Sequence, residues 1–173
     1  MKSIIAIFGV AMALSVGTAS AQWTFQATLN GLGETPVNGS TGTGFGTVIL
    51  NAAQTQITVN ESWSGITTPA TASHIHGPGG VGTNASVIFP FSSVPAATAG
   101  SIPEQSFAIN PTQVSWLFSG FLYMNVHDST FPGGEIRGQL ILVPEPSTAA
   151  LIGLGVGGFA LQAYRKRAKR LQC

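Results

Sequence analysis

Between residues 22 and 143 the chain carries short β-branched or aromatic segments separated by turn-forming residues, with no long apolar stripe of helical period. Apolar residues recur at every second position in several segments, as in Trp23, Phe25, Ala27 and Leu29, so one face of each strand is expected to be core. The pattern predicts an all-β domain, a Greek-key-like sandwich or barrel of about eight short strands. The predicted strands are residues 23–29, 44–50, 56–63, 72–76, 86–91, 105–109, 121–127 and 135–143.

Two details of this pattern concern local structure. Glu61 falls on the apolar face of its predicted strand, so either the register shifts there or the carboxylate has a buried partner. Residues 111–120 lack the alternation of a strand and are expected to hold one helical turn.

The charged residues are distributed unevenly along the 173-residue chain. Arg137 is the only Lys or Arg between residues 22 and 143, and five acids lie in the same range, so its net charge is about −4. Nucleic-acid binding needs clustered cations, so nucleic acid is excluded as a main partner. The only cysteine is Cys173, which excludes a disulfide framework and a catalytic cysteine within this range.

The N-terminal segment, residues 1–21, has the features of a secretory signal peptide. Lys2 precedes an apolar stretch, and Ala19 and Ala21 form the small-x-small pattern that signal peptidase accepts. We expect cleavage before Gln22. The alternative is a retained membrane helix, against which the shortness of the apolar stretch argues.

The C-terminal segment, residues 144–173, follows directly on the predicted β domain and combines three features. Residues 148–164 are apolar and just long enough for a membrane-spanning helix, and residues 165–170 are a basic cluster expected to stay cytoplasmic. A proline-containing motif precedes them, made of Val143, Pro144, Glu145, Pro146 and Ser147. Motif, apolar helix and basic cluster in this order resemble the PEP-CTERM sorting signal of Gram-negative bacteria.

This resemblance implies recognition by an exosortase, a membrane-embedded cysteine protease, with removal of the helix. The precursor would be anchored in the inner membrane and the product delivered to the cell surface or extracellular matrix. Because this sorting system accompanies exopolysaccharide production, exopolysaccharide and surface proteins are the partners implied. A plain anchor that is never cut is the alternative.

The three histidines of the chain are the one group of residues whose types and spacing point to a chemical site. His74 and His76 project from the same face of an extended segment, and His127 ends another predicted strand. A hairpin through the following turn would place Glu135 near His127. We predict one metal site for zinc or copper, made of His74, His76 and His127 with Glu135 or Asp128 as an oxygen ligand. The alternative is that His74 and His76 hydrogen-bond loop backbone, while Glu135 pairs with Arg137 or caps the Gly-rich loop.

Several segments together resemble the CHRD domain, which is named from the secreted growth-factor antagonist chordin and occurs widely in bacterial exported proteins. Ser73 and Met124 depart from the residues usual there, Ala and a β-branched residue. The resemblance implies an extracellular β-sandwich, but the animal role does not transfer, because a bacterium lacks the growth factor. The segments are residues 25–29, 33–37, 72–78, 122–127 and 132–139, within a match of roughly 25–140.

The His-x-His strand is also similar to that of copper/zinc superoxide dismutase. That enzyme uses six histidines and an aspartate, whereas this chain has three histidines, so dismutase activity is not expected. A Gly-x-Ser-x-Gly elbow and a glycosidase-like acidic pair are both absent from the sequence. We therefore predict a non-enzymatic surface or matrix protein with a candidate metal site. A metal-dependent enzyme of superoxide-dismutase-like architecture is the alternative.

Overall fold

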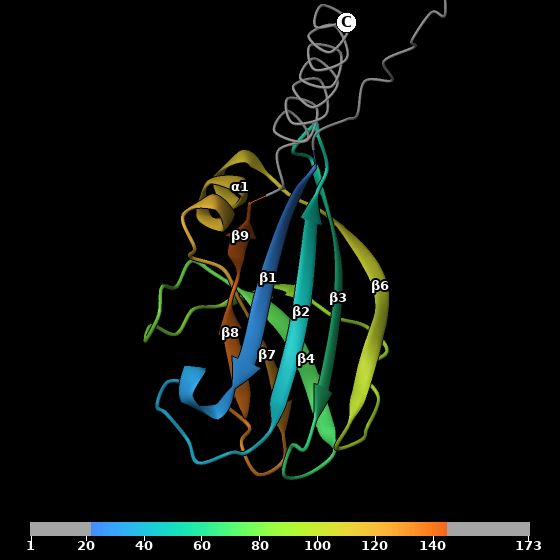
Figure 1. Ribbon diagram of the computed structural model, residues 1–173, viewed down its shortest axis with the longest axis vertical. Helices are drawn as coiled ribbons and strands as arrows, with labels where there is room; N and C mark the ends of the chain where they lie inside the picture. The colour runs from blue at the N-terminus through green and yellow to red at the C-terminus, as the bar shows by residue number, and fades with distance from the viewer. Residues whose placement is uncertain (1–21, 145–173) are drawn as a thin grey trace, which may run out of the picture.

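The computed structural model describes residues 22–144, in which nine strands surround an apolar core and one short α-helix lies at one end (Figure 1). The strands are β1 (Trp23–Asn30), β2 (Thr43–Leu50), β3 (Gln56–Ser64), β4 (Ala70–His76), β5 (Val87–Pro90), β6 (Gly100–Ala108), β7 (Tyr123–Asp128), β8 (Ile136–Gln139) and β9 (Ile141–Val143). The helices are the 3₁₀ turn η1 (Gly31–Gly33) and α1 (Pro111–Phe118).

Some predictions fall outside the described residues. These are the signal peptide with its cleavage site, the last three residues of the sorting motif, the apolar segment 148–164 and the basic cluster 165–170. No helix within residues 22–144 has both the length and the apolar character needed to cross a bilayer.

The strands form one antiparallel sheet that curls into a nearly closed barrel. Its order is β5-β4-β7-β8-β1-β2-β3-β6, and β9 pairs with the first half of β1. Neighbours in this order are often distant in sequence, as with β1, which lies between β8 and β2. The predicted all-β class is confirmed, and the architecture is a barrel.

The apolar side chains at every second strand position fill the barrel interior, as the predicted period of two requires. Phe25, Ala27 and Leu29 of β1 are buried, while Gln26 and Thr28 between them are exposed. Fully burying one large apolar side chain contributes about 1.5–3 kcal/mol relative to leaving it exposed. The alternation along the strands therefore supplies the main stabilisation of the fold.

Three elements differ from the prediction. Strand β6 begins at Gly100, whereas the predicted strand begins at Gln105. The helix in 111–120 is longer than one turn because Asn110 and Gln113 form a reciprocal capping box and Pro111 begins the helix. The predicted strand 135–143 is two strands: β8 pairs with β7 and with the end of β1, and β9 pairs only with the first half of β1. Leu140 lies between them, fully buried.

Both explanations offered for Glu61 are found in the barrel. The pairing of β3 with β6 shifts register between Val59 and Glu61, and the Ser73 hydroxyl on β4 donates a hydrogen bond to Glu61 Oε2. Oε1 is buried without a hydrogen-bond partner among residues 22–144. Burial raises the pKa of Glu61 to about 8, against the smaller lowering effect of Ser73.

Candidate metal centre

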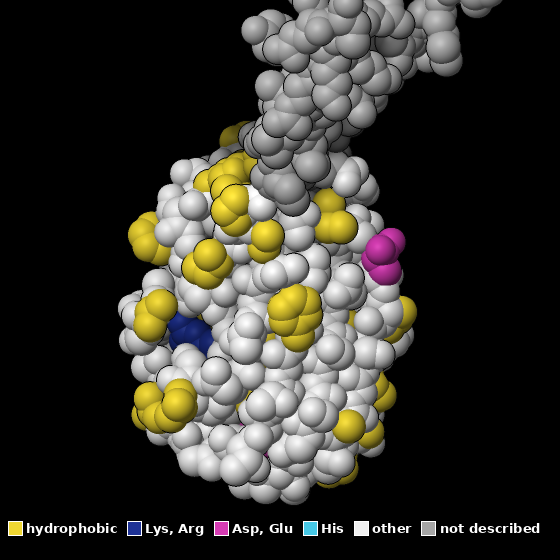
Figure 2. All heavy atoms as spheres, in the orientation of Figure 1, with side chains coloured by type: hydrophobic (Ala, Val, Ile, Leu, Met, Phe, Trp, Pro, Cys, Tyr) yellow, Lys and Arg dark blue, Asp and Glu magenta, His cyan; other side chains and the backbone are white. Residues whose placement is uncertain are grey.

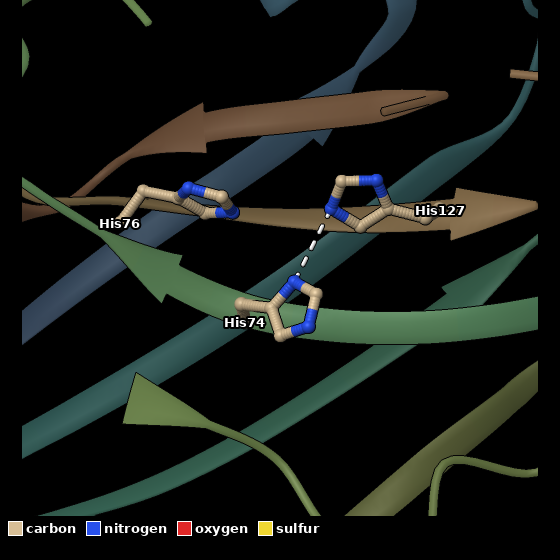
Figure 3. A group of neighbouring side chains, drawn as sticks. All are labelled: His74, His76 and His127. Atoms are coloured by element: carbon tan, nitrogen blue, oxygen red, sulfur yellow. Dashed lines mark hydrogen bonds between the residues drawn. The ribbon is translucent and has the colours of Figure 1, made fainter. Parts of the chain in front are cut away.

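Strands β4 and β7 bring the three predicted histidines together (Figure 3). They pair antiparallel, with His74 opposite Asn125 and His76 opposite Tyr123, while His127 lies opposite Ala72. The intervening residues of both strands point into the core, so the three imidazoles share the outer face of the sheet. The cluster follows directly from strand alternation and register.

One ring nitrogen from each histidine lies within 4.8 Å of the other two, which makes the group able to hold a metal ion. The closest approach is 3.3 Å between His74 Nδ1 and His127 Nε2. Zinc–nitrogen bonds of about 2.0–2.1 Å in a tetrahedron separate two ligand atoms by about 3.3 Å. The His74–His127 pair therefore has the spacing of two ligands on one ion.

Backbone carbonyls set the tautomers of two of these rings. His76 Nδ1 lies 2.8 Å from the Ala85 carbonyl oxygen, and His127 Nδ1 lies 3.1 Å from that of Pro132. Because a carbonyl only accepts, each Nδ1 carries the proton and each Nε2 presents a lone pair. His76 Nε2 is buried with no hydrogen-bond partner among residues 22–144. Metal-binding histidines are commonly oriented in this way.

The surroundings keep the imidazoles neutral. Burial lowers the pKa of all three histidines, and for His74 burial together with His127 and His76 lowers the pKa to about 4. Neutral imidazole is the form that binds metal. Near neutral pH the Nε2 lone pairs of His76 and His127 are therefore available. His74 Nδ1 donates to His127 Nε2 in this structure, so it presents a lone pair once its proton moves to Nε2.

The loop over residues 77–86 is tied to the sheet beside His76. Arg137 on β8 is buried, and its Nη2 donates to the carbonyls of Gly80 and Thr83 at 3.0 and 2.9 Å. These bonds hold the chain just before Ala85, whose carbonyl orients His76. Arg137 thus acts on the histidine group through the loop.

The two candidate oxygen ligands, Glu135 and Asp128, lie apart from the group of three ligand atoms. Glu135 Oε1 accepts from Thr67 N and Thr67 Oγ1, both at 2.8 Å, and from the Ser40 hydroxyl. Asp128 accepts from Thr68 and from the backbone of Phe131. Glu135 as a ligand stays a prediction, and its present hydrogen bonds weigh against it.

Asn125 lies beside the histidine group, although the sequence did not single it out. Its Oδ1 lies 3.0 Å from His127 Nε2, and its Nδ2 lies 3.5 Å from Glu34 Oε1. With the His127 proton on Nδ1, two lone pairs face one another, an arrangement that a cation between them would stabilise. Asn125 stands two residues before His127, so alternation alone would have placed both on one face.

The comparisons with known proteins agree with this structure. The CHRD domain model matches residues 25–140, more than half of the chain. The chain belongs to the CHRD family. All three histidines and Asn125 lie within its CHRD domain. No curated protein and no solved structure matches the chain.

A second match, to the PEP-CTERM protein-sorting motif, covers residues 142–166, directly after the CHRD domain. This motif implies an exported protein that is first anchored in the membrane and then sorted to the surface by an exosortase. Val143, the first residue of the motif predicted from the sequence, is also the last residue of β9. The sorting segment therefore follows the barrel without an intervening linker.

Proposed function

We propose that this CHRD domain is a non-enzymatic metal-binding protein of the cell surface or extracellular matrix, holding one zinc or copper ion. The ligands would be His74 Nδ1, His76 Nε2 and His127 Nε2. The observation that supports this most strongly is the pair of backbone carbonyls, of Ala85 and Pro132, that turn two Nε2 lone pairs toward the site.

A binding role, as opposed to catalysis, is supported by the surroundings of the three nitrogens. Asn125 Oδ1 supplies a fourth donor beside His127, and structural zinc sites are commonly closed by four protein ligands. His76 is only 8% exposed, and His74 and His127 are half-buried, which limits the access of a substrate to the three nitrogens. A metal-dependent enzyme would instead need an open coordination position.

The surface of the domain supports a place in a polysaccharide matrix. Of the charged side chains in residues 22–144 only Glu104 is exposed, because Glu34, Glu61, Asp128, Glu135 and Arg137 are at most 5% exposed. Figure 2 accordingly shows one face that is mostly uncharged. A surface of hydroxyls, amides and backbone suits contact with hydrated, hydroxyl-rich polymers such as exopolysaccharide, which is our proposed partner after sorting.

The decisive measurement is metal per chain. The processed domain is purified without chelator or metal-affinity resin and analysed by elemental mass spectrometry, beside His76→Ala and His127→Ala. We expect about one metal ion per wild-type chain and a loss in both variants. Metal-free wild-type protein that also takes up neither zinc nor copper on titration would refute the proposal.

Glu135→Gln is the matched control. It changes a buried carboxylate that lies outside the histidine group, and we expect its metal content to equal that of the wild type. A loss of metal in this variant with an unchanged fold would restore Glu135 as the oxygen ligand. An ion that is redox-active and exchanges a bound water would support the enzyme alternative.

A further inference from the structure

One end of the barrel carries a group of apolar side chains exposed to solvent. Phe118 at the end of α1 is 40% exposed, and Ile141 and Leu142 of β9 are 58% and 40% exposed. Trp23, half-buried at the start of β1, contacts the Phe118 ring edge-on, with centroids 5.8 Å apart. We name these four residues the apical patch. Figure 2 shows hydrophobic side chains gathered at the end where Figure 1 places α1 and β9.

The apical patch is uncharged. Neither α1 nor β9 contains an acidic or basic residue. A groove of about 230 Å³ runs between them, and Ser119 is the one polar side chain in its lining, which otherwise consists of Leu117, Phe118, Gly120, Leu140, Ile141 and Leu142. Such a patch has no charged side chain to pair with a charged partner, so it is suited to an apolar or zwitterionic partner.

The position of the patch along the chain identifies that partner. β9 ends at Val143, and the apolar segment 148–164 begins after four residues. The five Cα–Cα steps from Val143 to Thr148 span at most about 18 Å. While the segment is in the membrane, the end of the barrel that carries β9 cannot lie further than this from the apolar layer. The polar interface of a bilayer is itself about 5–8 Å thick on each side.

We propose that, before exosortase processing, the CHRD domain rests its apical patch in the interfacial layer of the membrane, with neutral phospholipid as the partner. Aromatic side chains such as Trp23 and Phe118 are favourable at this depth. The contact orients the barrel so that the sorting motif lies at the membrane surface, where a membrane-embedded protease acts. The inference rests on the membrane-anchored stage and is independent of metal binding.

The test uses the full chain reconstituted in phosphatidylcholine vesicles that carry a spin label on the lipid headgroup. Cys173→Ser removes the native thiol, and Ser119→Cys places a fluorophore beside Phe118. Leu32→Cys is the matched control, since Leu32 is 77% exposed and lies in η1 at the opposite end of the barrel (Figure 1). In chains that float with the vesicles, we expect the lipid spin label to quench the probe at 119 and not the probe at 32.

A second variant tests whether the quenching at 119 comes from contact between the patch and lipid, or only from the membrane anchor holding the barrel near the bilayer. Ile141→Ser with Leu142→Ser changes two exposed side chains and leaves Phe118 packed against Phe25 of the core, so the barrel should remain folded, and we expect the variant to lose most of the quenching at 119. Quenching that is unchanged in this variant overturns the proposal. So does a probe at 119 that is shielded from water yet not quenched by lipid, because the chain's own tail or a second copy would then cover the patch. Metal content measured on the same samples keeps this outcome separate from the proposed metal site.

Discussion

Tyr123 lies flat against His76, with ring centroids 4.9 Å apart and 4° between the ring planes. Arg137 also lies over the Tyr123 ring, with its Cζ 3.4 Å from the centroid. The Tyr123 hydroxyl accepts a 3.0 Å hydrogen bond from the Ala85 N–H, and the carbonyl of the same residue accepts from His76 Nδ1. The plane of His76 and its tautomer are therefore fixed by one connected set of contacts.

This arrangement predicts that Tyr123 controls metal affinity without touching the metal. Tyr123→Leu removes the stack and the hydroxyl, and we expect it to weaken metal binding by roughly 10–100-fold, the usual range for groups that orient a ligand. Tyr123→Phe keeps the stack and should lose less. Competition with a chromophoric chelator measures both. Equal affinities in all three proteins, each verified as folded by circular dichroism, would show that the stack is irrelevant to the site.

Asn125 is predicted to affect metal binding and stability in opposite directions when it becomes Asp. A carboxylate beside His127 Nε2 adds a charged oxygen ligand, so affinity for a divalent ion should increase. Without metal the same carboxylate faces Glu34, whose carboxylate lies 3.5 Å from the Asn125 amide, and like charges repel. We expect a lower melting temperature for the metal-free variant and a larger rise on adding zinc. If both the metal-free melting temperature and its rise on adding zinc are lower than in the wild type, Asn125 does not bind the metal.

The sequence predicted an all-β sandwich or barrel and the histidine cluster, because both depend on alternation; it did not distinguish the nearly closed barrel from a sandwich. In a strand, alternate residues share a face, and the apolar residues decide which face is buried. His74 and His76 therefore lie together on the outer face. The same rule would have added Asn125 to the cluster. The strand boundaries shifted by one or two residues in most cases, where pairing continued into the flanking turn.

The position of the Glu135 side chain could not be predicted from the sequence, because the strand pairing between β7 and β8 begins at Ile136 and does not include Glu135. Gly134 adopts a φ of +130°, so the alternation of β8 begins only at Ile136. Glu135 then reaches Ser40 and Thr67, which are distant in sequence. The tautomers likewise depend on the carbonyls of loop residues, and loops have no period from which their geometry follows.

Glu61 gives a prediction for the pH dependence of stability. Its pKa is about 8 in the folded barrel and near 4.5 in the unfolded chain, so between these values the folded state holds more protons. The free energy of unfolding therefore falls as pH rises through this range, and the contribution of the neutral carboxyl is complete only below about pH 4.5. Glu61→Gln removes the ionisation, and at pH 9 we expect it to be more stable than wild type by roughly 2–5 kcal/mol.

Denaturant unfolding of both proteins from pH 5 to pH 9 checks this expectation. The histidines affect both proteins equally, so the difference between them isolates Glu61. A stability difference that stays constant across the range would mean that Glu61 ionises normally in the folded state.

The two glycines of the 129–134 turn, Gly133 and Gly134, give a matched pair of variants. They test the contact between the Glu34 carboxylate and the Asn125 amide beside the histidines. Gly134 has a positive φ, and a Cβ there would collide with Glu34 Oε1 and Asn125 Nδ2, whereas a Cβ on Gly133 would meet nothing within 4 Å. Gly134→Ala should therefore destabilise the domain by roughly 1–3 kcal/mol and displace Asn125 from His127, which lowers metal affinity as well. Gly133→Ala should change stability by no more than about 0.5 kcal/mol and leave metal binding intact. Thermal unfolding and chelator competition measure the two effects, and equal behaviour of the two variants would contradict the packing of Glu34 against Asn125.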